Sequence, residues 1–210
     1  MLILPLDQCL KRYNFEFFSF NSTTSTMDEA KLKIDTVKKN LILLSKEQTK
    51  GRGRRGQKWI SPPGNIYCSI ALLVDLPSND LFKLGMLASV AIKRSLEHIG
   101  LFKIIFKWPN DIYCHNKKIS GIIQESYLNR NEKRILIIGI GINFLSSPQN
   151  SIYKTTYISK YVNNISREKY IEIFINYFLS YFNKFFLIND TSFVIEYKKL
   201  QMFLNTNIKI

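Results

Sequence analysis

Residues 104–143 read IIFKWPNDIYCHNKKISGIIQESYLNRNEKRILIIGIGIN, and this stretch decides the fold. It consists of short apolar runs separated by turn residues, which is the pattern of successive strands joined by hairpins. Turns are expected at residues 115–117 and 129–131. The predicted strands cover residues 104–106, 112–114, 119–127 and 134–142. This run of hairpins indicates a sheet whose neighbouring strands are antiparallel.

The remaining segments alternate between strands and helices. Their apolar and aromatic content predicts strands at residues 15–20, 41–45 and 65–74, and a further strand could begin at 207–210. Apolar spacing predicts helices at residues 27–39, 80–98, 167–188 and 193–200. Thr26 is the predicted N-cap of the first helix, with Asp28 and Glu29 in its first turn. The fold class is therefore α+β, with a mixed, mainly antiparallel central sheet and flanking helices.

The composition indicates a folded chain with one domain. It has 210 residues, of which 46% are apolar, and a formal net charge of +14. Such a charge is typical of a protein that binds nucleic acid or another polyanion, but it also arises by compositional drift. The lysines are scattered and only one basic run is dense, so drift is the favoured interpretation.

The few cysteines and histidines exclude several kinds of site. Cys9, Cys68 and Cys114 have no paired spacing, which argues against a disulfide framework or a cysteine metal site and favours a reducing cytoplasm. Two histidines are too few for a histidine-rich metal centre. The N-terminus lacks the order of a secretory signal. The longest apolar run, residues 135–145, is too short to cross a bilayer, so a soluble protein is expected.

Residues 47–64, EQTKGRGRRGQKWISPPG, predict a long functional loop. Residues 51–56 satisfy G-x-G-x-x-G, but no helix opens within the motif and no acidic residue follows at the required spacing, so a dinucleotide site is rejected. Glycines let backbone N–H groups approach an anion, and arginines bind phosphoryl or carboxylate oxygens in bidentate fashion. The loop alone fits a phosphate ligand and a nucleic-acid backbone equally well.

Three further motifs favour a small anionic ligand. Lys107-Trp108-Pro109-Asn110-Asp111 follows a strand, and Pro makes a rigid corner that places the amide and carboxylate. Lys118 stands at the mouth of a buried strand, where it can lose water and pair with an anion. Residues 139–143, GIGIN, end a strand in flexible backbone and one amide. A structural turn and a charged hairpin edge remain the alternatives for the first two motifs.

These motifs make the chain resemble the biotin protein ligases. Five occur in the family order: residues 25–30 (STMDEA); Gln48 with residues 51–56 and Trp59; residues 107–111 (KWPND); residues 118–121 (KISG); and residues 139–143 (GIGIN). The arginine–glycine loop and KWPND at this separation are highly specific. The resemblance covers roughly residues 14–190. Lipoate ligases are similar in fold but lack the arginine–glycine loop.

The resemblance implies a role for each motif residue, with biotin buried beside the sheet. Ser25, Thr26 and Gln48 would hydrogen-bond the ureido ring, while Lys118 would contact the reacting carboxylate and phosphoryl oxygens. The implied biotin-binding residues are Ser25, Thr26, Met27, Gln48, Arg52, Gly53, Arg54, Trp59, Lys118 and Gly121. The implied ATP-binding residues are Arg54, Arg55, Lys107, Asn110 and Asn143. The implied catalytic residues are Lys118, Arg52 and Asp111, and no residue is assigned as a metal ligand.

The chemistry of such a reaction explains these residue types. A carboxylate that attacks the α-phosphate of ATP brings anions together, and arginines, a lysine and Mg²⁺ neutralise them. A loop that orders over the mixed anhydride excludes water. An acceptor lysine with a pKa of ~10.4 is protonated at pH 7, so a nearby carboxylate should assist, and Asp111 is the candidate.

The resemblance also implies substrates, partners and a domain plan. Biotin and ATP are the expected substrates with Mg²⁺, and the expected partner is the biotin carboxyl-carrier protein of acetyl-CoA carboxylase, in the cytoplasm. Neither DNA nor a membrane is expected as a partner. The oligomeric state stays open, with a homodimer as one option. Residues 1–200 would form the catalytic domain and 201–210 the stub of a C-terminal β-barrel. With only about a dozen residues before the first strand, no DNA-binding domain and no repressor activity are expected.

Two other functions remain open. Family members usually carry a basic residue where Gln57 stands, and with the truncated barrel this leaves a degraded homologue that binds biotin with weak or no transfer. A basic nucleic-acid-binding protein is the alternative of another class, and its binding should weaken steeply as salt rises.

Overall fold

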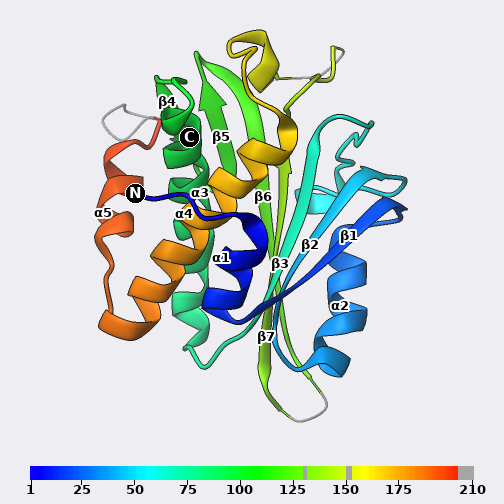
Figure 1. Ribbon diagram of the computed structural model, residues 1–210, viewed down its shortest axis with the longest axis vertical. Helices are drawn as coiled ribbons and strands as arrows, with labels where there is room; N and C mark the ends of the chain where they lie inside the picture. The colour runs from blue at the N-terminus through cyan, green and yellow to red at the C-terminus, as the bar shows by residue number, and fades with distance from the viewer. Residues whose placement is uncertain (130–131, 150–152, 203–210) are drawn as a thin grey trace.

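A seven-stranded sheet forms the centre of the computed structural model, which describes residues 1–129, 132–149 and 153–202 (Figure 1). The strands are β1 (Phe15–Thr23), β2 (Asn40–Gln48), β3 (Ile66–Leu73), β4 (Ile104–Lys107), β5 (Asp111–Cys114), β6 (Lys117–Leu128) and β7 (Arg134–Ile142). Their order is β1-β2-β3-β7-β6-β5-β4. Only β1 and β2 pair in parallel and the other neighbours are antiparallel, so the predicted α+β class and mixed sheet are confirmed.

Helices cover both faces of the sheet unequally (Figure 1). The helix α2 (Thr26–Val37) lies on one face, and four helices lie on the other. These four are α1 (Leu6–Tyr13), α3 (Leu81–His98), α4 (Arg167–Ile188) and α5 (Ser192–Lys199). Short 3-10 turns occur at Arg54–Gly56, Ser78–Asp80 and Ile158–Lys160.

The alternation of side chains along β7 shows how the two cores are divided. Leu136, Ile138, Ile140 and Ile142 point into the large core with α1, α3, α4 and α5. Ile135 and Ile137 point the other way and pack with Met27, Ala30 and Ile34 of α2. Successive residues of a strand face opposite sides of a sheet. Gly139 and Gly141 therefore continue the α2 side of the strand.

The glycines of β7 serve close packing and not flexibility, which corrects the prediction for the GIGIN segment. Both lie within the regular strand, and neither has a positive φ. A methyl group at Gly139 would overlap the sulfur of Met27, and one at Gly141 would overlap the indole of Trp59. Only a residue without Cβ lets these side chains lie directly on the sheet.

The bounds of β7 and α4 agree with the sequence prediction, whereas the N-terminal region differs from it. The helix α1 was not predicted, and Ser25 takes the N-cap position of α2 that was expected for Thr26. β2 extends three residues further than expected, to Gln48, and so shortens the predicted loop. The strand expected at 207–210 and part of the turn expected at 129–131 lie outside the described residues.

The helix α4 is long and apolar enough to cross a membrane by length and composition, a feature the sequence prediction overlooked. Its residues Tyr170, Phe174, Phe178 and Leu179 are buried in the large core. One face of α4 thus packs against α3 and α1 in the manner of a core helix.

The three cysteines are free and buried, as expected from their spacing. Burial raises the pKa of the Cys9 and Cys114 thiols to about 11 and that of Cys68 to about 12. Because the thiolate is the reactive form, the native protein is expected to resist a thiol reagent at pH 8 over hours. Counting modified thiols by absorbance tests this, with urea-unfolded protein as the control that reacts fully; rapid native labelling would contradict the burial.

Candidate active site

A cavity of about 730 Å³ lies on the α2 side of the sheet, where α2 begins. Its floor includes a glycine strip formed by Gly121 of β6 and by Gly139 and Gly141 of β7. A volume of this size suits a small organic ligand. Its wall combines the start of α2, the loop after β2, the Trp108–Asp111 corner, the start of β6 and the end of β7. Most predicted site residues line it: Ser25, Thr26, Met27, Gln48, Arg52, Gly53, Arg54, Arg55, Trp59, Asn110, Asp111, Lys118, Gly121 and Asn143.

Trp59 lies flat on the glycine strip. Gly121 of β6 pairs directly with Gly141 of β7, and the indole covers both residues. Its buried Nε1 has no hydrogen-bond partner among the described residues. An unpaired buried donor is costly, so the position of the indole against the sheet is maintained by its packing and not by a hydrogen bond of this N–H.

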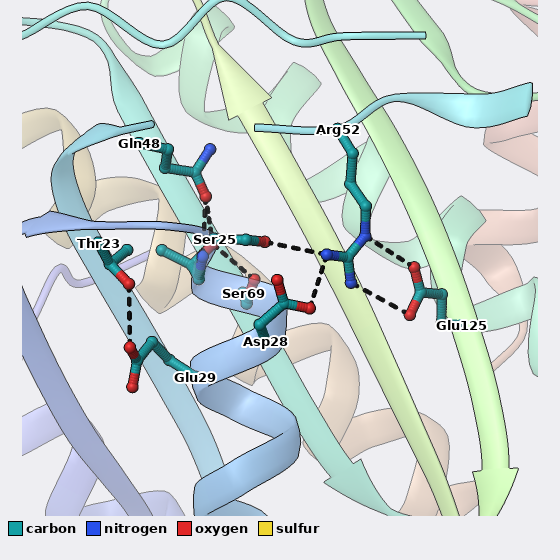
Figure 2. A network of polar contacts seen from close by, with 9 residues as sticks. Thr23, Ser25, Asp28, Glu29, Gln48, Arg52, Ser69 and Glu125 are labelled. Atoms are coloured by element: carbon teal, nitrogen blue, oxygen red, sulfur yellow. Dashed lines mark hydrogen bonds and ion pairs between the residues drawn. The ribbon is translucent and has the colours of Figure 1, made fainter. Parts of the chain in front are cut away.

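A chain of hydrogen bonds fixes the polar end of the cavity (Figure 2). The Gln48 Oε1 accepts from the Thr26 amide at 2.8 Å and from the Thr26 hydroxyl at 3.1 Å. The Ser69 hydroxyl donates to Thr26 Oγ1 at 2.8 Å, and Gln48 Nε2 donates to Ser61 Oγ at 3.1 Å. Thr26 is therefore tied to Gln48 and Ser69 instead of capping α2. The chain presents preorganised donors and acceptors beside an apolar floor.

Lys118 and Asp111 form an ion pair at the other end of the cavity. The Lys118 Nζ lies 2.7 Å from Asp111 Oδ1, and the two side chains are 17% and 15% exposed. This buried oxygen has no aligned hydrogen-bond donor, so the contact is an ion pair only. The Lys118 ammonium also lies 5.4 Å from the centre of the Trp59 ring. The backbone N–H of Lys118 donates to the Lys154 carbonyl at 2.8 Å.

The cavity wall is strongly cationic. Among the described residues that line it, five are cations, Arg52, Arg54, Arg55, Lys58 and Lys118, and one is a carboxylate, Asp111. Clefts lined by one sign of charge concentrate ligands of the opposite sign. The arrangement favours an anionic ligand.

Arg52 crosses the cavity edge between two carboxylates that the sequence reasoning did not connect with it (Figure 2). Its NH1 lies 2.6 Å from Asp28 Oδ1, and its Nε lies 3.1 Å from Glu125 Oε1. Burial alone would lower the pKa of Arg52, but the hydrogen bonds and charges of Glu125 and Asp28 outweigh it and raise that pKa.

The residues predicted to bind ATP are dispersed. Arg54 NH1 is 3.4 Å from Asn110 Oδ1, while Arg55 is exposed at the loop tip with a φ of 53°. Asn143 is buried and donates to the Thr156 carbonyl at 3.0 Å. Lys107 does not line the cavity, and its ammonium lies 5.1 Å from the centre of the Tyr153 ring. The structure thus brings Arg54, Arg55, Asn110 and Asn143 to one cavity and leaves Lys107 outside it.

Asn65 is a buried residue that the sequence reasoning missed. Its Oδ1 accepts from the backbone N–H groups of Phe144 and Leu145 at 2.9 Å and of Ser146 at 3.1 Å. It therefore shapes the segment that follows β7 and Asn143.

Asn65→Ala is expected to lower the free energy of unfolding by more than about 2 kcal/mol, because it leaves buried donors unpaired. Asn65→Asp keeps the acceptor oxygen and is expected to lose less. Urea unfolding of both variants measures the difference, and equal losses would show that the acceptor is not what stabilises the segment.

The described residues contain no group of three His, Cys, Asp or Glu side chains that could hold a metal ion. Asp111, the one carboxylate lining the cavity, is already paired with Lys118. The side chains described here do not form a cage for Mg²⁺.

Comparison with known sequences relates the chain to protein ligases. Residues 17–143 match the model of the biotin/lipoate A/B protein ligase family. The bifunctional ligase/repressor BirA of Bacillus subtilis is 34% identical over 131 residues, which cover 62% of this chain and 40% of that protein. A biotin--[acetyl-CoA-carboxylase] ligase of Paracoccus denitrificans is 30% identical over 131 residues, covering 60% of this chain and 53% of that protein.

Solved structures agree with the observed fold. The biotin protein ligase from Aquifex aeolicus in complex with biotin and ATP superposes with a TM-score of 0.76 and 27% identity, over 90% of this chain and 79% of that one. The matching part of this chain spans about two-fifths to one-half of the two curated relatives named above.

Proposed function

Because the chain belongs to the biotin/lipoate A/B protein ligase family, we propose that it activates biotin with ATP and transfers it to a protein lysine. The acceptor would be the biotin-carrier domain of a carboxylase, as the name of the Paracoccus relative suggests. The observation that carries the proposal is one cavity with a fixed polar end at Thr26 and Gln48 and a cationic end at Lys118. The Paracoccus relative and the Aquifex structure, both named as biotin ligases, favour biotin over lipoate.

In the first step, Ser25, Thr26 and Gln48 bind the ureido ring of biotin, and Met27 and Trp59 enclose its apolar part. A carboxylate oxygen of biotin attacks the α-phosphorus of ATP, a new C–O–P linkage forms, and the bond to pyrophosphate breaks. Arg54 and Lys118 neutralise the negative charge that gathers in this step. Preorganised cations in a sheltered site stabilise such a transition state strongly.

Asn110 and Asn143 contribute to the nucleotide end in this proposal. Mg²⁺ enters with the phosphates of ATP and is part of that substrate. The donor set supports this, because the lining residues described in the structure offer one carboxylate, which Lys118 already holds.

In the second step, the acceptor lysine attacks the carbonyl carbon of the adenylate. The C–N bond forms, AMP leaves, and the amine loses a proton. Asp111 is proposed to accept that proton, which its place in the cavity wall beside Lys118 supports. Trp59 and the loop above it shelter the mixed anhydride from water until the lysine arrives.

The proposal places the reaction in the cytoplasm, which the free and buried state of all three cysteines supports. A nucleic-acid-binding function is less favoured, because Arg52 of the basic loop is already paired with two carboxylates, Asp28 and Glu125.

The test is transfer to an isolated carboxyl-carrier domain in the presence of ATP and biotin, followed by intact-mass spectrometry. The carrier should gain one biotinyl group, and a carrier with its acceptor lysine replaced by arginine should gain none. Biotin binding without any transfer would identify a degraded homologue instead.

A further inference from the structure

The arginine of the loop after β2 joins two elements that flank the cavity. Arg52 contacts Asp28 in the first turn of α2 and Glu125 on β6, which are 24 and 73 residues away in sequence. The contact with Glu125 is bidentate, with Nε at 3.1 Å from Oε1 and NH2 at 3.3 Å from Oε2. Figure 2 shows the guanidinium between the two carboxylates, with Ser25 Oγ at 3.4 Å.

Backbone contacts within the loop connect Arg52 to Trp59. Arg52 pairs with Lys58 in an isolated β-bridge, Gly53 donates to the Gln57 carbonyl at 2.6 Å, and Trp59 donates to the Gly51 carbonyl at 3.0 Å. Residues 51–59 thus form a small hairpin that ends on the indole of Trp59. Fixing Arg52 at one side therefore fixes Trp59 on the glycine strip at the other.

The local charge argues against Arg52 as the cation that meets a phosphate. Two carboxylates face one guanidinium, so the group as a whole is anionic, and a phosphate would have to displace Asp28 or Glu125. Lys118 faces one carboxylate only, and Arg54 contacts a neutral amide. Those two cations, together with Arg55 and Lys58 of the same wall, remain for the ligand.

We propose that Asp28, Arg52 and Glu125 form a latch that holds residues 51–59 closed over the cavity and so determines how long the acyl-adenylate is retained. Arg52 is then a positioning residue, which replaces the catalytic role expected from the sequence. This inference rests on the proposed ligase function for its consequence, whereas the contacts of the latch are made between residues of the chain itself.

The latch is tested with D28N/E125Q and R52Q in the full chain. In both variants the release of adenylate into solution should rise by roughly threefold to tenfold, because partly exposed ion pairs of this kind stabilise a closed form modestly. Biotin-dependent pyrophosphate exchange in D28N/E125Q should stay within a few-fold of the parent. Salt should speed release in the parent and much less in D28N/E125Q, since salt screens exposed pairs.

A matched control and a ligand-free readout complete the experiment. Glu16→Gln removes a similarly exposed ion pair between β1 and Lys39, which follows the C-terminal end of α2, and it should leave release unchanged. Trypsin should cleave after Arg54, Arg55 or Lys58 faster in unliganded D28N/E125Q than in the parent. This readout reports on the latch even if the protein makes no adenylate, so failure of the latch and failure of the ligase function are distinguishable.

Two results would overturn the latch. One is unchanged release and unchanged proteolysis in D28N/E125Q together with a ~10²–10³-fold loss of exchange in R52Q, which is the behaviour of a cation that acts on the phosphate. The other is faster proteolysis in Glu16→Gln to the same extent, which would indicate general loosening.

Discussion

Lys118→Gln is expected to lower the rate of biotin-dependent pyrophosphate exchange by ~10²–10³-fold, the usual cost of losing one preorganised charge donor. The lysine is well placed for this role because its ammonium lies in the cavity, largely sheltered from water, 2.7 Å from Asp111 and 5.4 Å from the Trp59 ring centre. Its backbone is fixed to residues 154–156 by hydrogen bonds of 2.8 and 2.9 Å. Glutamine keeps most of the side-chain length and removes the charge.

The neighbouring Lys117→Gln is the matched control, since Lys117 does not line the cavity. Exchange in that variant should stay close to the parent value. Equal losses in the two variants, or none in Lys118→Gln, would contradict the assignment of the charge to Lys118.

Asp111→Asn is expected to impair transfer to the acceptor more than formation of the adenylate. Losing a general base typically lowers the rate of the assisted step by ~10²–10⁴-fold. Exchange should fall less, and only because Lys118 loses its ion-pair partner. Single-turnover transfer from preformed adenylate to the carrier domain separates the two steps.

Asp75→Asn serves as the control, because Asp75 is exposed beyond the end of β3 and away from the cavity lining. If Asp111→Asn lowers exchange and transfer by the same factor, Asp111 acts through Lys118 alone and the proposed proton transfer is wrong.

The regular elements were largely predictable because their periodicity is local. The strand β7 alternates between two buried faces, and α4 carries apolar residues around most of its length, so the bounds of both were clear. The helix α1 was missed although Leu6, Cys9, Leu10 and Tyr13 have helical spacing. Its first residues were judged only as a targeting segment, and eight residues give a weak signal.

Contacts between distant residues were not predictable from the sequence. Asp28 was interpreted as a first-turn acid of a helix, and its partner Arg52 lies 24 residues further on. Glu125 follows Arg52 by 73 residues and points from a different strand. No spacing rule connects these three residues. The structure brings them together because α2 and β6 flank the same cavity.

For Gly121 and Gly141, the sequence showed the residues but not their structural role. Gly121 and Gly141 were noted as parts of motifs, but their function depends on the register that pairs them and on the indole above them. The sequence prediction treated Gly141 as flexible backbone at a strand end and made no structural prediction for Gly121. The pairing of β6 with β7 shows that they form the floor on which Trp59 lies.

The exchange of radiolabelled pyrophosphate into ATP, with and without biotin, tests the central claim most directly. Exchange should require biotin and should fall sharply in Lys118→Gln, while Lys117→Gln should exchange at the rate of the parent protein. Folded parent protein that shows neither exchange nor biotin binding would contradict it.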